Sequence, residues 1–189
     1  MNKIIITIYN SNGDFFMNKK FIISNIILTF LISFIVHGLY NFIPSVLTSI
    51  FPVNESLYEH VKLIYLSPII SSIILYFYFK IIKGYKVNNF LFGLISSIIF
   101  NIIIFYLLYL PFYNMYGAVM WMTLTIYFIS LILSGYLYYL IISMDNNKKL
   151  NIISFFLLII GIFILTYFTY NPLKIDFFLD TTTNSYGIK

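Results

Sequence analysis

The densest group of polar side chains in the chain follows Pro52 and is flanked on both sides by apolar residues. Carboxylates and imidazoles act as general acids and bases in enzymes, which makes Glu59 and His60 candidate catalytic residues. The same side-chain types supply the oxygen and nitrogen ligands that suit zinc or a similar divalent ion. The residues that this stretch contributes to a candidate ligand or partner site are Asn54, Glu55, Ser56, Glu59, His60 and Lys62.

The second histidine, His37, lies near the end of the preceding apolar run, and a single loop joins that run to the one beginning near His60. Both imidazoles are therefore expected in the same layer, at one end of a helical bundle. Tyr40 follows His37, and the C-terminal tail adds Asp180 and Tyr186 to the same candidate site. The spacing matches no standard zinc motif. The four candidate metal ligands are His37, Glu55, Glu59 and His60.

The same residues also have a purely structural explanation. Ser56 and Glu59 fit a capping box at the start of a helix. Glu59 and Lys62 have the i, i+3 spacing of a helical ion pair, and a lysine at this depth can extend its ammonium group to the headgroup layer. The run from Glu55 to Lys62 covers only about 10 Å of helix, which fits inside that layer. Residue types alone leave the two explanations open.

The elements that position these residues must lie in lipid, because 61% of the chain is hydrophobic and only 9% is charged. A soluble domain carries about 25% charged residues. A helix needs about 20 apolar residues to cross a bilayer, and lipid cannot satisfy open backbone groups. The sequence therefore predicts an all-α bundle of five transmembrane helices, between an N-terminal segment at 1–20 and a tail at 171–189. The predicted spans are 21–39, 57–79, 90–110, 118–142 and 150–170.

Lysines set the expected orientation. Eight of them fall on the side of the N-terminus and three on the opposite side. Because positive residues favour the cytoplasmic side, the N-terminus is expected inside and the C-terminus outside, in a bacterial cytoplasmic membrane. The basic excess lies at the ends of spans, so no nucleic-acid partner is expected; the bilayer is the expected partner, and a protein partner or homo-oligomer stays open. Residues 1–16 are either an extension of the cytoplasmic segment or a start-site artefact, because Met17 with its basic flank is itself typical of a start.

Several function classes are disfavoured. The chain contains no cysteine, which removes thiol nucleophiles and thiolate metal sites. No ionisable residue is predicted at the middle of the membrane, although a proton-coupled transporter normally needs one. The sequence contains no charged ring and no filter motif that would indicate a channel.

Residues 52–63 read Pro-Val-Asn-Glu-Ser-x-x-Glu-His-x-Lys-Leu, which resembles the signature of an uncharacterised family of small multi-pass membrane proteins found mostly in Firmicutes. His37 to Tyr40 is similar to a His-x-x-Tyr pattern that this family carries at the end of its first span. Asp180 to Gly187 is similar to the ending of its tail. The resemblance covers nearly the whole chain from Met17 onward.

The chain departs from the family pattern in four places. Thr181 stands where proline is usual, Asn41 and Phe42 replace Asp-Trp, and Tyr58 replaces tryptophan. The missing acid at Asn41 weakens any role of the family's aspartate as a ligand or base. The family has no assigned activity, so the resemblance implies the architecture and the position of a site, and no reaction.

Two hypotheses follow from the sequence. The first is a non-enzymatic membrane protein that binds a ligand, ion or partner at an outward-facing polar site. The second is a membrane-embedded enzyme, with a divalent metal as its possible cofactor, that acts on a lipid or envelope substrate through Glu59 and His60. The sequence does not decide whether the chain is an enzyme.

The orientation is testable because the chain has no cysteine background. Replacing Ser185 with cysteine is expected to give a residue that a membrane-impermeant maleimide labels in intact cells, since the tail is predicted to lie outside. Labelling that appears only after the cells are permeabilised would reverse the predicted orientation.

Overall fold

The computed structural model describes residues 2–42 and 49–188, with side chains from residue 17 onward except that of Asn41. Within these ranges the chain is all-α apart from a two-stranded antiparallel hairpin in the tail, which confirms the predicted fold class. Five helices are long and apolar enough to cross a membrane, and the first of these spans covers Met17–Gly38. The long elements are α1 (Asn2–Gly38), α3 (Leu57–Ile82), α4 (Phe90–Tyr116), α5 (Met120–Ile142) and α6 (Lys148–Tyr170), and the hairpin pairs β1 (Leu179–Asp180) with β2 (Ser185–Tyr186).

Several helices extend beyond the predicted spans: α1 begins at Asn2, before residue 21, and α3 ends at Ile82, after residue 79. The third span was expected to end at Leu110, before Pro111, but α4 continues to Tyr116. The helix ends instead at Gly117, whose φ of +72° is the region that glycine adopts without strain. The Gly117 N–H donates to the Tyr113 carbonyl at 2.8 Å and closes the last turn. The proline is thus tolerated inside the helix, and glycine is the residue that stops it.

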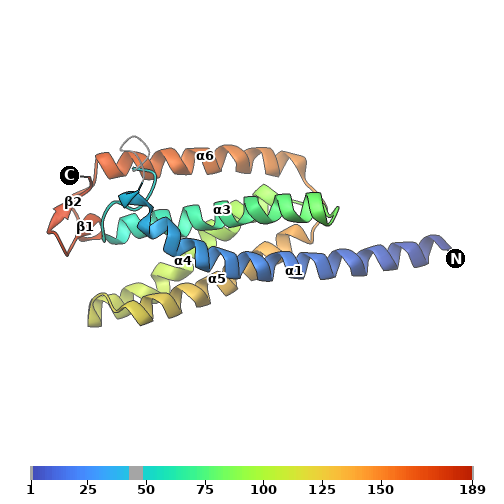
Figure 1. Cartoon of the computed structure of the whole chain (residues 1–189), viewed down its shortest axis with the longest axis horizontal. Helices are drawn as coiled ribbons and strands as arrows, with labels where there is room; N and C mark the ends of the chain where they lie inside the picture. The colour runs from blue at the N-terminus through green and yellow to red at the C-terminus, as the bar shows by residue number, and fades with distance from the viewer. Residues whose placement is uncertain (1, 43–48, 189) are drawn as a thin grey trace.

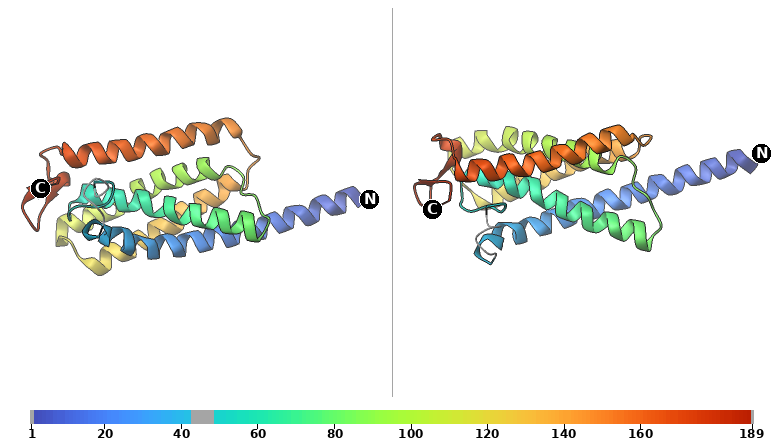
Figure 2. Two further views of the ribbon diagram at one scale, coloured as in Figure 1. Left: turned by 45° about the horizontal axis from the view of Figure 1, so that its top comes forward. Right: turned by 90° about the horizontal axis from the view of Figure 1, so that it is seen from above.

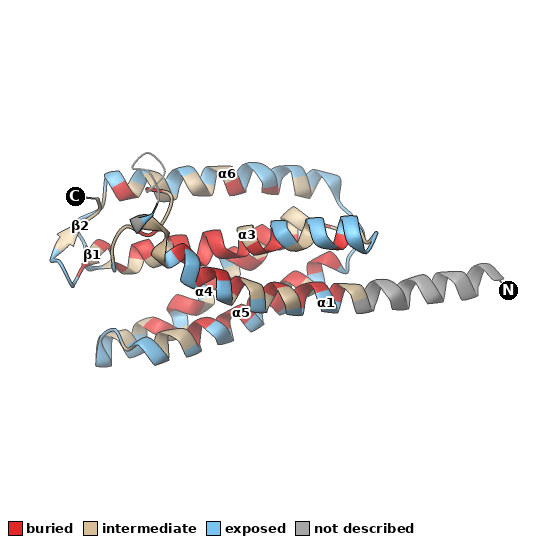
Figure 3. Ribbon diagram, in the orientation of Figure 1, coloured by how far each residue is buried: buried red, intermediate tan, exposed pale blue. Residues whose placement is uncertain are grey.

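The helices form one bundle in which α1 packs against α3 and α5, while α4 packs against α5, α3 and α6. Figure 1 shows α6 along one side of the bundle, and the left view of Figure 2 shows it away from α1. Burial follows this arrangement: α3 up to Ser72 and the inward faces of α4 and α5 are mostly buried, whereas the rest of α3 and most of α6 are exposed (Figure 3). Apolar exposure on the outside is what a surrounding bilayer requires.

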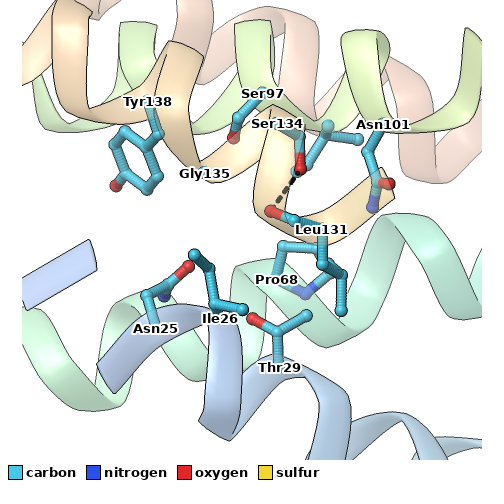
Figure 4. A pocket seen from close by; sticks show the side chains of 11 residues that line it. Asn25, Ile26, Thr29, Pro68, Ser97, Asn101, Leu131, Ser134, Gly135 and Tyr138 are labelled. Carbon is cyan, nitrogen blue, oxygen red and sulfur yellow. Dashed lines mark hydrogen bonds between the residues drawn. The ribbon is translucent and has the colours of Figure 1, made fainter. Parts of the chain in front are cut away.

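Polar side chains join helices inside the bundle. The amide nitrogen of Asn25 on α1 donates to Ser71 at 3.1 Å and to Ser72 at 2.8 Å, both on α3. Asn25 also lines a small cavity of about 10 Å³, whose lining includes Asn101 of α4 (Figure 4). Asn25 and Asn101 do not bond to each other, and among the described residues the buried Asn101 amide has no hydrogen-bond partner.

Tyr58 and Tyr65, about two turns apart on α3, attach α6 to the bundle. The Tyr58 hydroxyl donates to the Leu165 carbonyl at 2.8 Å, and the Tyr65 hydroxyl donates to the Leu158 carbonyl at 2.8 Å. Gly161 makes the second contact possible, because a Cβ atom there would lie 2.1 Å from the Tyr65 hydroxyl. These contacts fix α6 beside the end of α3 that carries the candidate site.

Candidate functional site

The candidate site lies at the end of the bundle where α1 ends, α3 begins and the tail hairpin packs (Figure 1). It contains a group that we call the His–Glu cluster: His37 from the last turn of α1, Glu55 from the loop before α3, and His60 from the first turn of α3. Each residue offers one possible ligand atom, and these three atoms lie within 4.8 Å of one another. Sequence reasoning placed all three residues in one layer, and the fold brings them into a single group.

The Glu55 carboxylate stands between the two imidazoles of the His–Glu cluster. The Glu55 Oε2 atom lies 3.6 Å from His37 Nε2 and 3.7 Å from His60 Nε2, and all three ligand atoms lie within 4.8 Å of one another. Ligand atoms about 2.0–2.2 Å from a tetrahedral zinc ion are separated by about 3.3–3.6 Å. The two separations that involve Glu55 are therefore close to the spacing that one shared ion would impose.

The orientation of His60 supports the same chemistry. Its Nδ1 atom lies 2.9 Å from the Ser56 carbonyl oxygen, and because a carbonyl can only accept, Nδ1 is the protonated nitrogen. In the neutral ring this leaves the Nε2 lone pair facing the Glu55 carboxylate. A lone pair and a carboxylate oxygen face each other stably only with a cation or a proton between them. A backbone carbonyl that fixes the tautomer of a ligating histidine is a common feature of metal sites.

Glu55 is in its charged form. The His37 imidazole beside it holds the pKa of the Glu55 carboxyl below its ordinary value, more strongly than partial burial raises it. The carboxylate side chain is half-exposed, with a relative accessibility of 50%, and the His37 side chain is 41% exposed. The cluster is thus reachable from outside the bundle, and its acid is ready to coordinate a cation.

Glu59, the fourth candidate ligand, is not in the cluster. It forms a buried ion pair with Lys62, with 2.6 Å between Glu59 Oε2 and Lys62 Nζ, and both side chains are at most 1% exposed. Lys62 also donates to the carbonyls of Ser49 at 2.8 Å and Phe51 at 3.2 Å. The predicted i, i+3 pair is therefore present, but both side chains are buried inside the protein and neither extends to its surface.

The carboxylate of the Glu59–Lys62 pair makes two more bonds that join separate parts of the chain. Glu59 Oε2 accepts from the Val53 backbone N–H at 3.0 Å, and Oε1 accepts from the Thr169 hydroxyl at 3.1 Å. The pair thereby ties the loop before α3 to the end of α6. Because Glu55 lies in this loop, the pair also helps to fix the position of the Glu55 carboxylate in the His–Glu cluster.

The start of α3 follows the predicted cap only in part. Ser56 is the N-cap, and its hydroxyl accepts from the Glu59 N–H at 3.3 Å. The reciprocal half of a capping box is replaced, because the Ser56 N–H donates to Asn54 Oδ1 at 2.9 Å. The Glu59 carboxylate is thereby left for the ion pair with Lys62.

The tail packs over this end of the bundle. The Asn54 amide donates to the Gly187 carbonyl at 2.9 Å, and the Ile188 N–H donates to the Thr169 carbonyl at 3.3 Å. Gly187 has φ of +64° and approaches Thr169 so closely that a Cβ atom there would lie 2.5 Å from its carbonyl oxygen. The ring of Tyr58 stacks on Phe178 with 4.3 Å between centroids. The tail therefore packs against the end of the bundle that carries the candidate site, and it is not a free extension.

Asp180 supports the tail from within. Burial raises the pKa of its carboxyl, but hydrogen bonds from Thr182 and Thr183 outweigh that effect and leave the pKa below its ordinary value. The Thr182 N–H donates to Asp180 Oδ1 at 2.9 Å, and the Thr183 hydroxyl donates to Oδ2 at 2.7 Å. Of the remaining candidate residues, Tyr40 lies in the short helix η1 (Leu39–Asn41) and Tyr186 in β2, and both are partly exposed.

A cavity of about 450 Å³ opens beside the His–Glu cluster, and all three cluster residues line it. Its walls come from α1, α3, α4 and α5, and Thr181 and Thr182 of the tail complete its lining. Sequence reasoning identified neither the cavity nor Thr169. A threonine near the end of a span and scattered aromatic residues carry no signal of a site until the helices are placed in space.

The buried pair gives a stability prediction. Replacing Lys62 with methionine is expected to lower the free energy of unfolding by about 3–5 kcal/mol, because the Glu59 charge stays buried without its cation. The matched control is Lys174→Met, an exposed lysine of the tail at the same end. The double variant Glu59→Gln/Lys62→Met should recover part of the loss. Unfolding in mixed micelles measures all three, and equal stabilities for the Lys62 and Lys174 variants would contradict the assignment.

Comparison with known proteins adds the family. No curated protein and no solved structure matches the chain at a significant level. Residues 11–188 match a family of unknown function, DUF6512. This range includes the parts of the helices and strands that form the candidate site. The chain therefore belongs to the DUF6512 family, as a multi-pass membrane protein with five candidate spans.

Proposed function

We propose that the chain is a metal-binding membrane protein whose His–Glu cluster holds one divalent transition-metal ion. The observation that supports this most directly is the convergence of three ligand atoms, from His37, Glu55 and His60, within 4.8 Å. The three residues come from a helix end, a loop and a helix start, so no local structural need explains their meeting. The buried Glu59–Lys62 pair, which makes no contact with the bound ion in this proposal, keeps the loop in place.

Zinc fits this donor set best. Two imidazole nitrogens and one carboxylate oxygen form the His₂Glu set that is typical of zinc, whereas magnesium and calcium prefer oxygen ligands alone. Three protein ligands leave a fourth tetrahedral position free, which is the pattern of catalytic zinc sites; structural sites use four protein ligands. The partly exposed His37 and Glu55 side chains give an ion a path to the site.

The membrane setting of the proposal follows from the lysine distribution. The C-terminal tail lies at the end of the bundle where α1 ends and α3 begins (Figure 1), and Thr181 and Thr182 of the tail line the same cavity as the His–Glu cluster. Because the lysines favour a cytoplasmic N-terminus, this end faces outside in the proposal, in a bacterial cytoplasmic membrane. An external position gives the site access to metal ions and to molecules of the outer leaflet.

Metal content tests the proposal. The purified protein, stripped with a chelator and reloaded with zinc, is expected to retain about one zinc ion per chain, and His37→Ala, His60→Ala and Glu55→Gln should each lose it because each removes a ligand. Mass spectrometry of the eluted metal gives the count.

The matched control for the carboxylate is Asp176→Asn, an exposed acid at the same end of the molecule that should leave the zinc content unchanged. Zinc that is absent from the wild type, or that survives in His60→Ala at the same stoichiometry, would refute the metal site.

One observation favours a second function, metal-assisted hydrolysis. The His–Glu cluster lines a large cavity, so the free coordination position would face a space where a substrate can bind. Zinc lowers the pKa of a bound water to about 7 and polarises carbonyl groups. In ester hydrolysis the water oxygen bonds to the carbonyl carbon, the bond to the alkoxy oxygen breaks, and the leaving alcohol takes the proton. Glu59 takes no part in this proposal, because it is buried against Lys62.

Hydrolysis of a small chromogenic ester, p-nitrophenyl acetate, tests the second function. The zinc-loaded protein is expected to hydrolyse it about a hundredfold faster than His60→Ala, since Lewis-acid activation contributes several kcal/mol to a transition state. Asp176→Asn should keep the wild-type rate. Equal rates for zinc-loaded wild type and His60→Ala would leave a metal-binding protein without this activity.

A further inference from the structure

We infer that the cavity beside the His–Glu cluster binds the apolar chain of a single-chain amphiphile, whose carboxylate or ester headgroup lies at the cluster. The inference rests on the proposed metal site for its headgroup contact and deepens it by naming the class of ligand. The volume of the cavity and its apolar walls support the binding of the chain.

The size and walls of the cavity fit an apolar ligand. Its volume of about 450 Å³ lies within the range of about 300–1,000 Å³ that is typical of sites for small molecules. Phe34, Leu63, Phe105 and Leu124 contribute one wall from each of four helices. A water-soluble metabolite would lose hydration against these side chains, whereas an alkyl chain gains by burial.

The polar and apolar residues of the cavity are ordered by depth. On α1, Phe34 is one turn deeper in the bundle than His37, and on α3, Leu63 and Ile64 are one turn deeper than His60. The ligand atoms of the cluster therefore stand at the mouth, and the apolar wall begins one turn below them. A molecule that fills both zones needs a polar head and an apolar chain in that order.

An aromatic ring forms part of the inner wall of the cavity. Tyr127 of α5 lines the cavity two turns deeper than Met120, and its side chain is 4% exposed. Its hydroxyl lies beside Ser33 of α1, another residue of the cavity lining. The ring of Tyr127 therefore offers an apolar chain a surface to pack on.

The position of the cavity also suits a molecule from the bilayer. Its walls come from the end turns of the membrane spans, where the headgroup region meets the acyl chains. Met120, which lines the cavity, and its neighbour Trp121 are 76% and 70% exposed at this level. An amphiphile in the leaflet already has its head and its chain at the depths that the site requires.

Photolabelling tests the inference. The zinc-loaded protein in phosphatidylcholine vesicles is illuminated with a dodecanoic acid probe that carries a diazirine near the end of its chain, and labelled residues are mapped by mass spectrometry. Labels are expected on cavity residues such as Leu124 and Tyr127. Leu124→Trp should sharply reduce them by narrowing the cavity, whereas Leu133→Trp, on the lipid-exposed face of the same helix, should not.

Zinc content in the same samples separates the two proposals. Leu124→Trp that keeps its zinc but loses most of its cavity labelling supports the inference and shows that the variant is folded. Labels confined to lipid-facing residues such as Leu133, with zinc bound in the wild type, would overturn the inference and leave the metal site intact. Cavity labelling that chelation of the zinc leaves unchanged would overturn the headgroup contact with the metal.

Discussion

The buried ion pair between Glu59 and Lys62 is the interaction on which this end of the molecule depends. Burying two charges is costly unless every partner is satisfied, and here the surrounding backbone satisfies them: Lys62 binds two loop carbonyls, and Glu59 binds a loop N–H and the Thr169 hydroxyl of α6. The loop that carries Glu55 is thereby fixed against two helices. Removing either member of the pair would leave the other charge buried without its partner and would release the loop from α3 and α6.

Two acids four residues apart thus have different tasks. Glu55 points to two histidines and stays half-exposed, while Glu59 is withdrawn into the interior. A stretch that reads as one polar cluster in sequence is divided by the fold into a group that can bind a cation and a group that holds it in place. The cavity beside the His–Glu cluster is polar at its mouth and apolar in its interior.

The sequence predicted the helices and the residues of the candidate site better than the contacts between them. Five spans, the helix start at Ser56 and the common layer of His37 and His60 followed from hydrophobic length, capping and connectivity. The burial of Lys62 did not, because a lysine near a span end is expected to reach the headgroups, and only the folded loop supplies carbonyls for it inside. The continuation of α4 through Pro111, the packing of the tail on Asn54 and the cavity likewise depend on long-range contacts that no local pattern records.

X-ray absorption at the zinc edge tests the central claim most directly, because it reports the atoms around the ion. The His–Glu cluster predicts a four-coordinate zinc with two imidazole nitrogens and one carboxylate oxygen at about 2.0–2.2 Å, and a fourth light atom from solvent or ligand. A six-coordinate shell of oxygens without imidazole scattering would show that the metal is held elsewhere. That result would contradict the proposal that His37, Glu55 and His60 form the site.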